Sequence, residues 1–290
     1  MTRYDCLFVD LDGVVYRGPH AVVHAVDALN AFDGRVVYVT NNASRTPQVV
    51  AEQLSSYGLE VLPEDVVTSA QAAAAHLAGL VPPGSRVLVT GGDGLVQAVR
   101  AHGLQVVTAA DEAEAVVQGY SPSLAWKDLA EASYALARDI PWVASNTDMS
   151  VPTARGIAPG NGTLVAAVAA ATGRRPIVTG KPHEPIMELA RSRAGAARPL
   201  VIGDRLDTDI AAARAAAMDS LLVLTGVNSW RDLLTLSPAE LPTFVAPDLR
   251  FLHGHRDALT DALEVLLAAL CEARDVSQAV QRLEQIPQAQ

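Results

Sequence analysis

The chain has 290 residues, of which 50% are hydrophobic and 19% charged, with a net charge of −10 at pH 7. This length exceeds the usual size of one domain and predicts two domains, or one core with a large insertion. The composition excludes a disordered chain, no apolar run reaches the roughly 18 residues of a membrane span, and the acidic charge argues against nucleic acid, whose phosphates bind basic surfaces.

The N-terminus and the cysteines also exclude classes of protein. The sequence passes from Met1 into an apolar stretch without the basic segment, long apolar region and cleavage site of a signal peptide, so we expect a cytoplasmic protein. Cys6 and Cys271 lie far apart with no CxxC spacing, which predicts neither a disulfide framework nor a thiolate zinc site.

Short runs rich in Val, Leu and Ile alternate with Ala-rich stretches of helical spacing. This alternation predicts a parallel α/β sheet covered by helices, because strands buried on both faces are apolar along their whole length. Strands are expected at 6–9, 35–39, 199–202 and 220–224. Helices are expected at 47–57, 69–80, 184–193 and 207–217.

A second set of such elements lies between the Pro/Gly segments 82–84 and 180–182. We interpret it as an inserted α/β domain bounded by hinges. The predicted domains are a discontinuous core at 1–83 and 179–250 and an insertion at 84–178. Within the insertion, strands are expected at 86–90, 115–118 and 141–145, and helices at 94–101, 128–138 and 163–171.

Residues 251–290 follow the predicted core. Leucines between Leu259 and Leu270 recur at spacings of three and four residues, which predicts a helical C-terminal extension with one apolar face. Three contacts for that face stay open: the core, a partner subunit, or a segment outside this sequence.

Two carboxylates, Asp10 and Asp12, follow the first predicted strand at the edge where open α/β sheets bind ligands. In a phosphatase, one carboxylate of such a pair attacks phosphorus, and the other protonates the leaving alkoxide and then activates water. The alternative is a strand-end turn in which Asp and Gly serve solvation and chain geometry. The pair alone leaves both interpretations open.

Neutral polar side chains, Thr40, Asn41 and Asn42, follow the second predicted strand at the same edge. Such groups can hold phosphoryl oxygens without competing for a metal. The alternative is capping of the next helix, for which Ser44 and Thr46 are suited. We expect Thr40 to face a substrate, and Ser44 or Thr46 to be the cap.

Lys181 stands between Gly180 and Pro182, small and rigid neighbours. An ammonium held there can neutralise the charge of an aspartyl phosphate. A lysine by itself is more often a solvated surface charge, so the assignment depends on the other motifs.

Acidic residues also follow the strand predicted at 199–202, where Asp204, Asp207 and Asp209 open a helix. Carboxylates of Asp204 and Asp10, with a backbone carbonyl and waters, suit octahedral Mg²⁺. Acids at a helix N-terminus also act as caps, and we assign that role to Asp207.

The chain resembles haloacid dehalogenase-type phosphatases in four motifs that stand in the family's order. They are Asp10-x-Asp12, Thr40, Lys181 and Gly203-Asp204-x-x-x-Thr208-Asp209. The insertion resembles the C2-type cap of the subgroup containing nitrophenyl phosphatases, the NagD-type nucleotide phosphatase, pyridoxal phosphatase and phosphoglycolate phosphatase. The chain is also similar to actinobacterial glycerol-3-phosphate phosphatases at 40–45, 159–162, 203–210 and 224–228.

The resemblance implies a Rossmann-like, doubly wound parallel sheet with an inserted α/β cap, and Mg²⁺-dependent chemistry through an aspartyl phosphate. Asp10 is then the nucleophile and Asp12 the acid and base, with Thr40 and Lys181 as further catalytic residues. The expected substrate-binding residues of the core are Thr40, Asn41, Asn42 and Lys181. The expected metal ligands are Asp10, Asp12, Asp204 and Asp209.

In similar proteins the cap closes over the site, excludes water and reads the leaving group. Asp148 and Arg155, in a loop shaped by Gly and Pro, are therefore expected to contact the substrate. The alternative is a well-turned loop in which Asn161 caps the following helix. Residues 146–162 contain no Phe, Tyr or Trp, which favours a small polyol or acid over a ring that stacks.

We expect glycerol 3-phosphate as the substrate, hydrolysed to glycerol and phosphate. Phosphoglycolate, a nucleoside monophosphate and pyridoxal phosphate are alternatives with the same chemistry. A non-catalytic, phosphate-responsive binding module is a remote alternative, which needs neither the insertion nor Asp12. The expected partner is thus a small phosphorylated metabolite rather than nucleic acid or a membrane, and a homodimer is left open.

Overall fold

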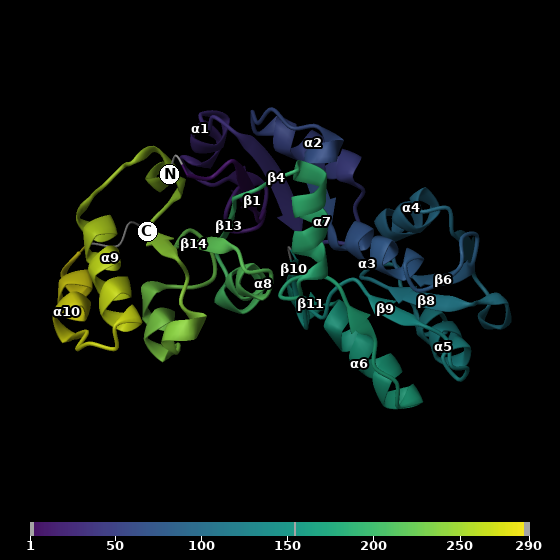
Figure 1. Ribbon diagram of the computed structural model, residues 1–290. Coiled ribbons are helices and arrows are strands. Elements are labelled where there is room, and N and C mark those ends of the chain that lie inside the picture. The colour runs from purple at the N-terminus through teal and green to yellow at the C-terminus, as the bar shows by residue number, and fades with distance from the viewer. Residues whose placement is uncertain (1–2, 154, 287–290) are drawn as a thin grey trace. The chain divides into compact units, whose positions relative to one another are not determined.

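The structure, a computed structural model, describes residues 3–153 and 155–286 (Figure 1). The chain divides into two compact units. Unit 1 comprises residues 1–39, 53–61 and 190–290, and unit 2 comprises residues 40–52 and 62–189. The predicted domain boundaries at residues 84 and 178 stay a prediction.

Unit 1 contains a parallel sheet, as predicted. Its strands are β1 (Cys6–Val9), β4 (Arg35–Thr40), β13 (Pro199–Gly203), β14 (Asp219–Val223) and β15 (Phe244–Ala246). They lie in the order β15-β14-β13-β1-β4, with Val9 opposite both Ile202 and Tyr38. Because β4 lies on one side of β1 and the later strands on the other, the chain changes direction across the sheet at β1. Open α/β sheets bind ligands beyond the carboxyl end of such a strand.

Unit 1 also contains a strand pair and several helices. They are the strands β2 (Tyr16–Arg17) and β3 (His20–Ala21), the helices α1 (Ala25–Asn30), α8 (Ala211–Ala215), α9 (Ala258–Cys271) and α10 (Ser277–Gln285), and the short helices η3 (Leu206–Ile210), η4 (Trp230–Thr235), η5 (Pro238–Glu240) and η6 (Leu249–His253). Helix α2 (Pro47–Ser56) and helix α7 (Pro185–Ala194) each contribute residues to both units.

The helix predicted at 207–217 is interrupted. It begins as a π-helix, η3, in which the amides of Asp209 and Ile210 both donate to the carbonyl of Arg205 at 3.1 Å, and only then continues as α8. The wider turn follows from the side chain of Asp209, whose Oδ2 turns back to accept from the amide of Arg205 at 3.2 Å. Single π-turns of this kind are frequent at functional sites.

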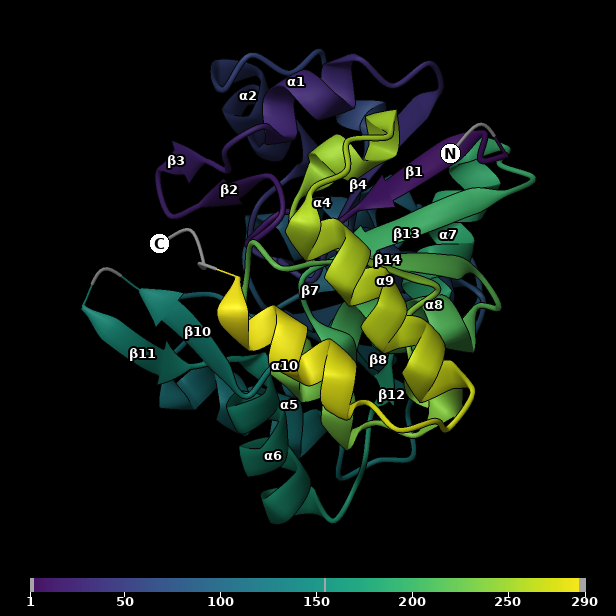
Figure 2. The same cartoon turned by 90° about the vertical axis from the view of Figure 1, so that its left-hand side faces the viewer.

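The C-terminal extension packs on the core of unit 1. Helix α9 contacts α10 and β15, and Figure 2 shows α9 and α10 side by side. Leu263 and Leu266 are fully buried in a cluster with Leu222 and Trp230, and each such leucine contributes about 1.5–3 kcal/mol. Of the three contacts left open for the apolar face of the extension, the structure shows contact with the core of unit 1. Residues 287–290 lie outside the described residues.

Unit 2 has its own parallel sheet in the order β12-β9-β8-β6-β7. Its strands are β6 (Arg86–Thr90), β7 (Gln105–Val107), β8 (Ala115–Gln118), β9 (Trp142–Ala144) and β12 (Ile177–Val178). The other elements are β5 (Val66–Thr68), β10 (Ser150–Thr153), β11 (Gly156–Pro159), α3 (Ser69–Ala78), α4 (Asp93–Ala101), α5 (Trp126–Ala135), α6 (Asn161–Thr172), η1 (Pro63–Asp65) and η2 (Ala110–Glu112).

Both faces of this second sheet are covered by helices (Figure 1). Alternate residues of a strand point to opposite faces, so Val87 and Val117 pack with α3 and α4, whereas Leu88 and Val116 pack with α5 and α6. The predicted strands and helices of the insertion are therefore present, each shifted by no more than three residues at either end.

Residues 146–162 are not only a loop, contrary to expectation. They contain the antiparallel hairpin of β10 and β11, in which Ser150 pairs with Pro159 and Thr153 with Gly156. The hairpin is largely exposed, so its sequence lacks the apolar alternation by which half-buried strands are recognised. Among the described residues, no helix is long and apolar enough to span a membrane.

Candidate functional site

Asp10 lies at the carboxyl end of β1, between its neighbours β4 and β13. The four residues of β1 are fully buried, and the amide of Asp10 continues the ladder by donating to the carbonyl of Ile202 at 2.9 Å. The side chain of Asp10 is partly exposed. The central strand thus holds the main chain of Asp10 at the edge where the chain changes direction, and the carboxylate of Asp10 stands at that edge.

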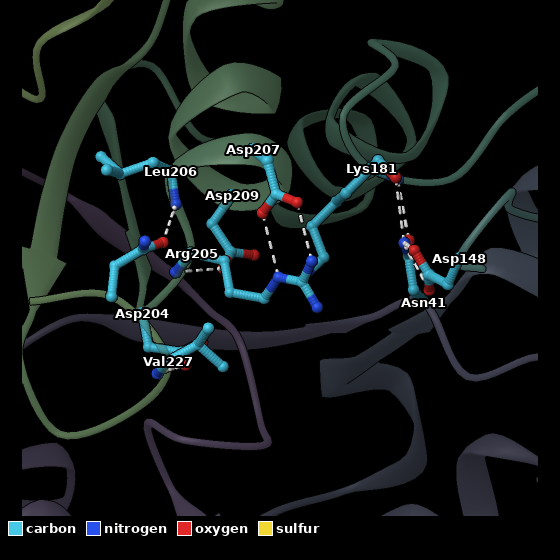
Figure 3. A network of polar contacts seen from close by, with 10 residues as sticks. Asn41, Asp148, Lys181, Asp204, Arg205, Leu206, Asp207, Asp209 and Val227 are labelled. Atoms are coloured by element: carbon cyan, nitrogen blue, oxygen red, sulfur yellow. Dashed lines mark hydrogen bonds and ion pairs between the residues drawn. The ribbon is translucent and has the colours of Figure 1, made fainter. Parts of the chain in front are cut away.

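Asp204 follows β13 and is 1% exposed. Its Oδ2 accepts a short hydrogen bond of 2.6 Å from the amide of Val227, and its carbonyl accepts from the amide of Asn228 at 3.2 Å (Figure 3). A Cβ on Gly226 would lie 1.8 Å from Oδ2 of Asp204, and one on Gly13 would lie 2.4 Å from the same atom. Two glycines therefore leave the space that this carboxylate occupies.

Asp209 is equally buried and belongs to the same group. One carboxylate oxygen each from Asp10, Asp204 and Asp209 lie within 4.8 Å of one another, and this is the group of possible metal ligands found within residues 3–153 and 155–286. A Cβ on Gly203 would lie 2.1 Å from Cβ of Asp209, so close packing at the end of β13 holds the third carboxylate in place.

The residues of this acidic group fit Mg²⁺. Three carboxylates at this separation repel one another strongly when two of them are buried, and a divalent cation offsets that repulsion. All the donors are oxygens, the ligand type that Mg²⁺ prefers, and one or two carboxylates completed by water are its usual protein ligands. Glycine in place of larger residues at 13 and 226 keeps the carboxylate of Asp204 in the group.

Asp12 is placed differently from the other predicted ligands. Its side chain is exposed, and among the described residues it does not join the acidic group of Asp10, Asp204 and Asp209. The turn that carries it is well defined, since the amide of Gly13 donates to the carbonyl of Tyr16 at 2.8 Å. The structure thus separates the two carboxylates of the first motif: Asp10 belongs to the acidic group, and Asp12 is exposed outside it.

The turn after Asp12 is tied to the loop that follows β14. The hydroxyl of Thr225 donates to the carbonyl of Gly13 at 2.6 Å, and the guanidinium of Arg17 donates to the carbonyl of Gly226 at 2.7 Å. The same loop supplies the amides that hold Asp204. Residues 224–228 were noted in the sequence only as part of the family resemblance and had no predicted role, although Gly226 and Asn228, two residues apart, are a turn signal at a strand end.

Asp207 is not a helix cap, contrary to expectation. It accepts two hydrogen bonds from the guanidinium of Arg205, at 3.0 and 2.7 Å (Figure 3). This pairing lowers the pKa of Asp207. Its side chain is exposed and does not belong to the acidic group of Asp10, Asp204 and Asp209.

In unit 2, Thr40 ends β4 and is buried. Its Oγ1 accepts from the amide of Asn42 at 3.1 Å, so the hydroxyl hydrogen can be donated to another group. Oδ1 of Asn42 accepts from the amide and hydroxyl of Ser44, both at 2.9 Å, which shapes the loop. Thr46 caps α2, because its Oγ1 accepts from the amide of Val49 at 3.3 Å.

Lys181, Asn41 and Asp148 lie together in unit 2 (Figure 3). Lys181 is 3% exposed, so the alternative of a solvated surface charge is wrong. The side chain of Asn41 forms hydrogen bonds with the amide and the carbonyl of Lys181. It also donates to the carboxylate of Asp148. Three residues that lie far apart in sequence are therefore one hydrogen-bonded group.

Two further asparagines of this region were missed or misassigned. Asn146, which had no predicted role, is buried and donates to the carbonyl of Asn41 at 2.7 Å. Asn161 is not the cap of α6; it is buried in the first turn and donates to the carbonyl of Asn146 at 2.7 Å. Arg155 lies exposed at the turn of the β10–β11 hairpin, and its expected contact with a substrate stays a prediction.

Comparison with known proteins assigns the family. The profile of haloacid dehalogenase-like hydrolases matches residues 7–105, and a second HAD-hydrolase-like profile matches residues 178–252. The chain is 48% identical over 252 residues to the D-glycerol 3-phosphate phosphatase of Mycobacterium tuberculosis, covering 87% of this chain and 71% of that protein. It is 35% identical over 254 residues to the 5′-nucleotidase YutF of Bacillus subtilis, covering 86% and 97%.

Solved structures show the same similarity. A glycerol phosphate phosphatase from Mycobacterium tuberculosis in complex with magnesium superimposes with a TM-score of 0.84 at 47% identity, over 90% of this chain and 78% of that one. The p-nitrophenyl phosphatase from Archaeoglobus fulgidus gives 0.79 at 30% identity, over 87% and 99%. The fold of these proteins therefore extends over nearly all of this chain. The chain belongs to the haloacid dehalogenase-like hydrolases and is a phosphoric monoester hydrolase.

Proposed function

We propose that the protein is a Mg²⁺-dependent phosphatase that hydrolyses glycerol 3-phosphate through an aspartyl phosphate on Asp10. The observation that carries the proposal is the group of Asp10, Asp204 and Asp209, which combines a partly exposed carboxylate with two buried ones. The buried pair suits a resident cation, and the partly exposed member suits contact with a substrate.

In this proposal Asp10 and Asp12 divide the chemistry. A carboxylate oxygen of Asp10 forms a bond to phosphorus while the bond to the ester oxygen breaks, and Asp12 gives its proton to the leaving alkoxide. Asp12 then takes a proton from water, whose oxygen attacks phosphorus. The bond between phosphorus and Asp10 breaks, phosphate leaves, and both carboxyl groups return to their starting states. The exposed position of Asp12 suits exchange of protons with a substrate or water.

The remaining charge is assigned to a cation and to donors. Asp10, Asp204 and Asp209 would hold Mg²⁺, which supplies electrostatic stabilisation of the transferring phosphoryl group. Lys181, whose main chain is held by hydrogen bonds, contributes a positive charge. The hydroxyl of Thr40 donates to a phosphoryl oxygen. Asp209 belongs to the acidic group itself, so its loss should weaken metal binding.

Glycerol 3-phosphate is favoured by two observations. The relative at 48% identity is a D-glycerol 3-phosphate phosphatase. The segment 146–162, which contains the β10–β11 hairpin, offers no aromatic ring on which a base or pyridine could stack. A nucleoside 5′-monophosphate is the second candidate, because the relative at 35% identity is a 5′-nucleotidase. A cytoplasmic location and a homodimer stay predictions.

The test is phosphate release from glycerol 3-phosphate, phosphoglycolate, nucleoside monophosphates and pyridoxal phosphate, with Mg²⁺ and with chelator. We expect selective turnover of glycerol 3-phosphate that the chelator abolishes and that Asp10→Asn lowers by roughly 10⁴-fold or more, the scale for loss of a nucleophile. Asp207→Asn is the matched control, because it makes the same chemical change at an exposed aspartate outside the acidic group.

Each result discriminates. Preferential turnover of a nucleoside monophosphate would replace the substrate while keeping the mechanism. Turnover by Asp10→Asn at the wild-type rate would refute the assigned nucleophile, and folded, Mg²⁺-loaded protein that hydrolyses none of these esters would refute the phosphatase proposal.

A further inference from the structure

The carboxamide of Asn41 has no donor left for a substrate. Its Oδ1 accepts from the amide of Lys181 at 2.8 Å, and its Nδ2 donates to the carbonyl of the same residue at 2.9 Å. Nδ2 also lies 3.2 and 3.1 Å from the two carboxylate oxygens of Asp148. A carboxamide nitrogen carries two hydrogens, and here one is directed to a carbonyl and the other to a carboxylate.

We propose that Asn41 is a positioning residue that holds the main chain of Lys181 and the carboxylate of Asp148, and that it does not bind the phosphoryl group itself. The inference rests on the proposed function, in which Lys181 acts on that group. It replaces the substrate-binding role that the sequence motif favours for Asn41.

The pair of hydrogen bonds to Lys181 resembles a rung of a sheet. One bond fixes the amide and the other the carbonyl of the same residue, so the main chain is held at both ends of its Cα. Lys181 is 3% exposed, and in such a site hydrogen bonds are stronger than in water. The direction in which the lysine side chain leaves the backbone is therefore set by Asn41.

The main chain of Asn41 is itself held by hydrogen bonds from buried side chains. Its carbonyl accepts from the hydroxyl of Ser69 at 2.6 Å and from Nδ2 of Asn146 at 2.7 Å. The carbonyl of Asn146 accepts in turn from Asn161 at 2.7 Å, and its Oδ1 accepts from the amide of Asp148 at 3.2 Å. Ser69, Asn146 and Asn161 are all buried, so the network has little freedom to move.

The chain leaves space for this contact at Gly180. A Cβ there would lie 2.7 Å from Oδ1 of Asn41 and 2.3 Å from the carbonyl of Ser145. A side chain at position 180 would therefore push the carboxamide away from the amide of Lys181. Glycine is therefore required before the lysine because both the carbonyl of Ser145 and the carboxamide of Asn41 approach closely.

The arrangement links two parts of the proposed reaction. Lys181 is expected to neutralise the phosphoryl group, and Asp148, just before the β10–β11 hairpin, is expected to contact the leaving group. Because one carboxamide holds both, loss of Asn41 should disturb the rate and the preference among leaving groups together. A residue that only bound phosphate would change affinity equally for all esters.

The closing experiment is a double-mutant cycle of Asn41→Ala and Lys181→Ala, with p-nitrophenyl phosphate and saturating Mg²⁺. In the wild-type background Asn41→Ala should lower kcat about 100-fold, the scale for a misplacement of about 1 Å. In the Lys181→Ala background its effect on kcat should be far smaller, because the part that acts through the side chain of Lys181 is already lost and only the contact with Asp148 remains. Equal losses in both backgrounds would overturn the inference.

Two further variants separate positioning from general damage. Ser69→Ala removes one of the two bonds to the carbonyl of Asn41 but leaves the carboxamide contacts, so kcat should fall far less than in Asn41→Ala. Asn41→Asp keeps the size but places a second carboxylate against Asp148, and Asp148→Asn in the same chain should restore part of kcat. No recovery in that double variant, with both proteins folded, would contradict the assigned contact.

Hydrogen exchange at the amide of Lys181 gives a readout that needs no activity. Asn41→Ala should speed this exchange, because the amide loses its acceptor, whereas Ser69→Ala should not. Wild-type protein without any phosphatase activity would refute the proposed function alone. Unchanged exchange in Asn41→Ala, or an additive cycle in an active enzyme, would refute the positioning role alone.

Discussion

Two groups of side chains, one in each unit, are held in place by different means. The acidic group of unit 1 depends on the main chain, because amides of the loop after β14 and of Arg205 donate to Asp204 and Asp209. The Asn41 network of unit 2 depends on side-chain amides. In both, glycine provides the space, at positions such as Gly226 and Gly180.

The difference follows from what is being held. A carboxylate only accepts hydrogen bonds, so the N–H groups at strand ends and turns suffice for it. The main chain of Lys181 has both an N–H donor and a C=O acceptor. A carboxamide can pair with both, because its oxygen accepts and its nitrogen donates. The main chain of a lysine is thus held by an asparagine side chain, whereas the aspartates of the acidic group are held by main-chain amides.

Gly226→Ala should have the largest effect on the acidic group. A Cβ there would overlap Oδ2, Cγ and Cβ of Asp204, so the carboxylate must leave its position. We expect the affinity for Mg²⁺, measured by isothermal titration calorimetry, to fall by about 100-fold, the upper range for loss of a residue that supports a metal ligand. Wild-type affinity in a folded Gly226→Ala protein would show that the main chain of this loop does not set the position of Asp204.

Gly180→Ala is the counterpart in the Asn41 network and should act on the rate instead. The added Cβ would lie 2.7 Å from Oδ1 of Asn41, within unit 2, whereas all three carboxylates of the acidic group belong to unit 1. We expect kcat for p-nitrophenyl phosphate to fall by about 10–100-fold while the calorimetric affinity for Mg²⁺ is unchanged. A loss of Mg²⁺ affinity equal to that of Gly226→Ala would erase the distinction between the two groups.

The smallest expected effect is on the free energy of unfolding and concerns Asp219 of unit 1, whose carboxylate is held by the side chain of Tyr4. Burial and the 2.7 Å hydrogen bond to Asp219 raise the pKa of Tyr4 from 10.0 to about 12. A raised pKa means that the neutral phenol stabilises the fold, so its contribution is complete below pH 10 and is lost as the pH rises through about 12. Tyr4→Phe should lower the free energy of unfolding by about 1 kcal/mol near neutral pH and by less toward pH 12.

Denaturant unfolding of the wild type and Tyr4→Phe between pH 8 and 12 measures this difference. Tyr134→Phe, which removes a hydroxyl from an exposed tyrosine of unit 2, is the control for loss of the group itself. A difference between wild type and Tyr4→Phe that grows with pH would contradict the sign of the shift.

Much of the fold was predictable because both sheets are parallel and buried. The strands 6–9, 86–90 and 115–118 were placed at their observed bounds, and the other predicted strands differ by one residue at one or both ends. The misses have physical reasons. The strands β10 and β11 are exposed and lack alternation, and in η3 the side chain of Asp209 accepts from the amide of Arg205, a contact that no apolar pattern predicts. Short strands such as β12 carry too few residues for a pattern to be recognised.

The sequence by itself determined which residue types stand at the ends of the central strands, since a run of apolar residues followed by Asp10, Thr40 or Asp204 is a local property of the chain. Only the tertiary structure decided how they are used. It gathered Asp10, Asp204 and Asp209 within one group, left Asp12 exposed, and assigned the carboxamide of Asn41 to the main chain of Lys181. Such choices depend on which donors and acceptors meet after the chain has closed loops of 100 residues and more, and no local pattern contains that information.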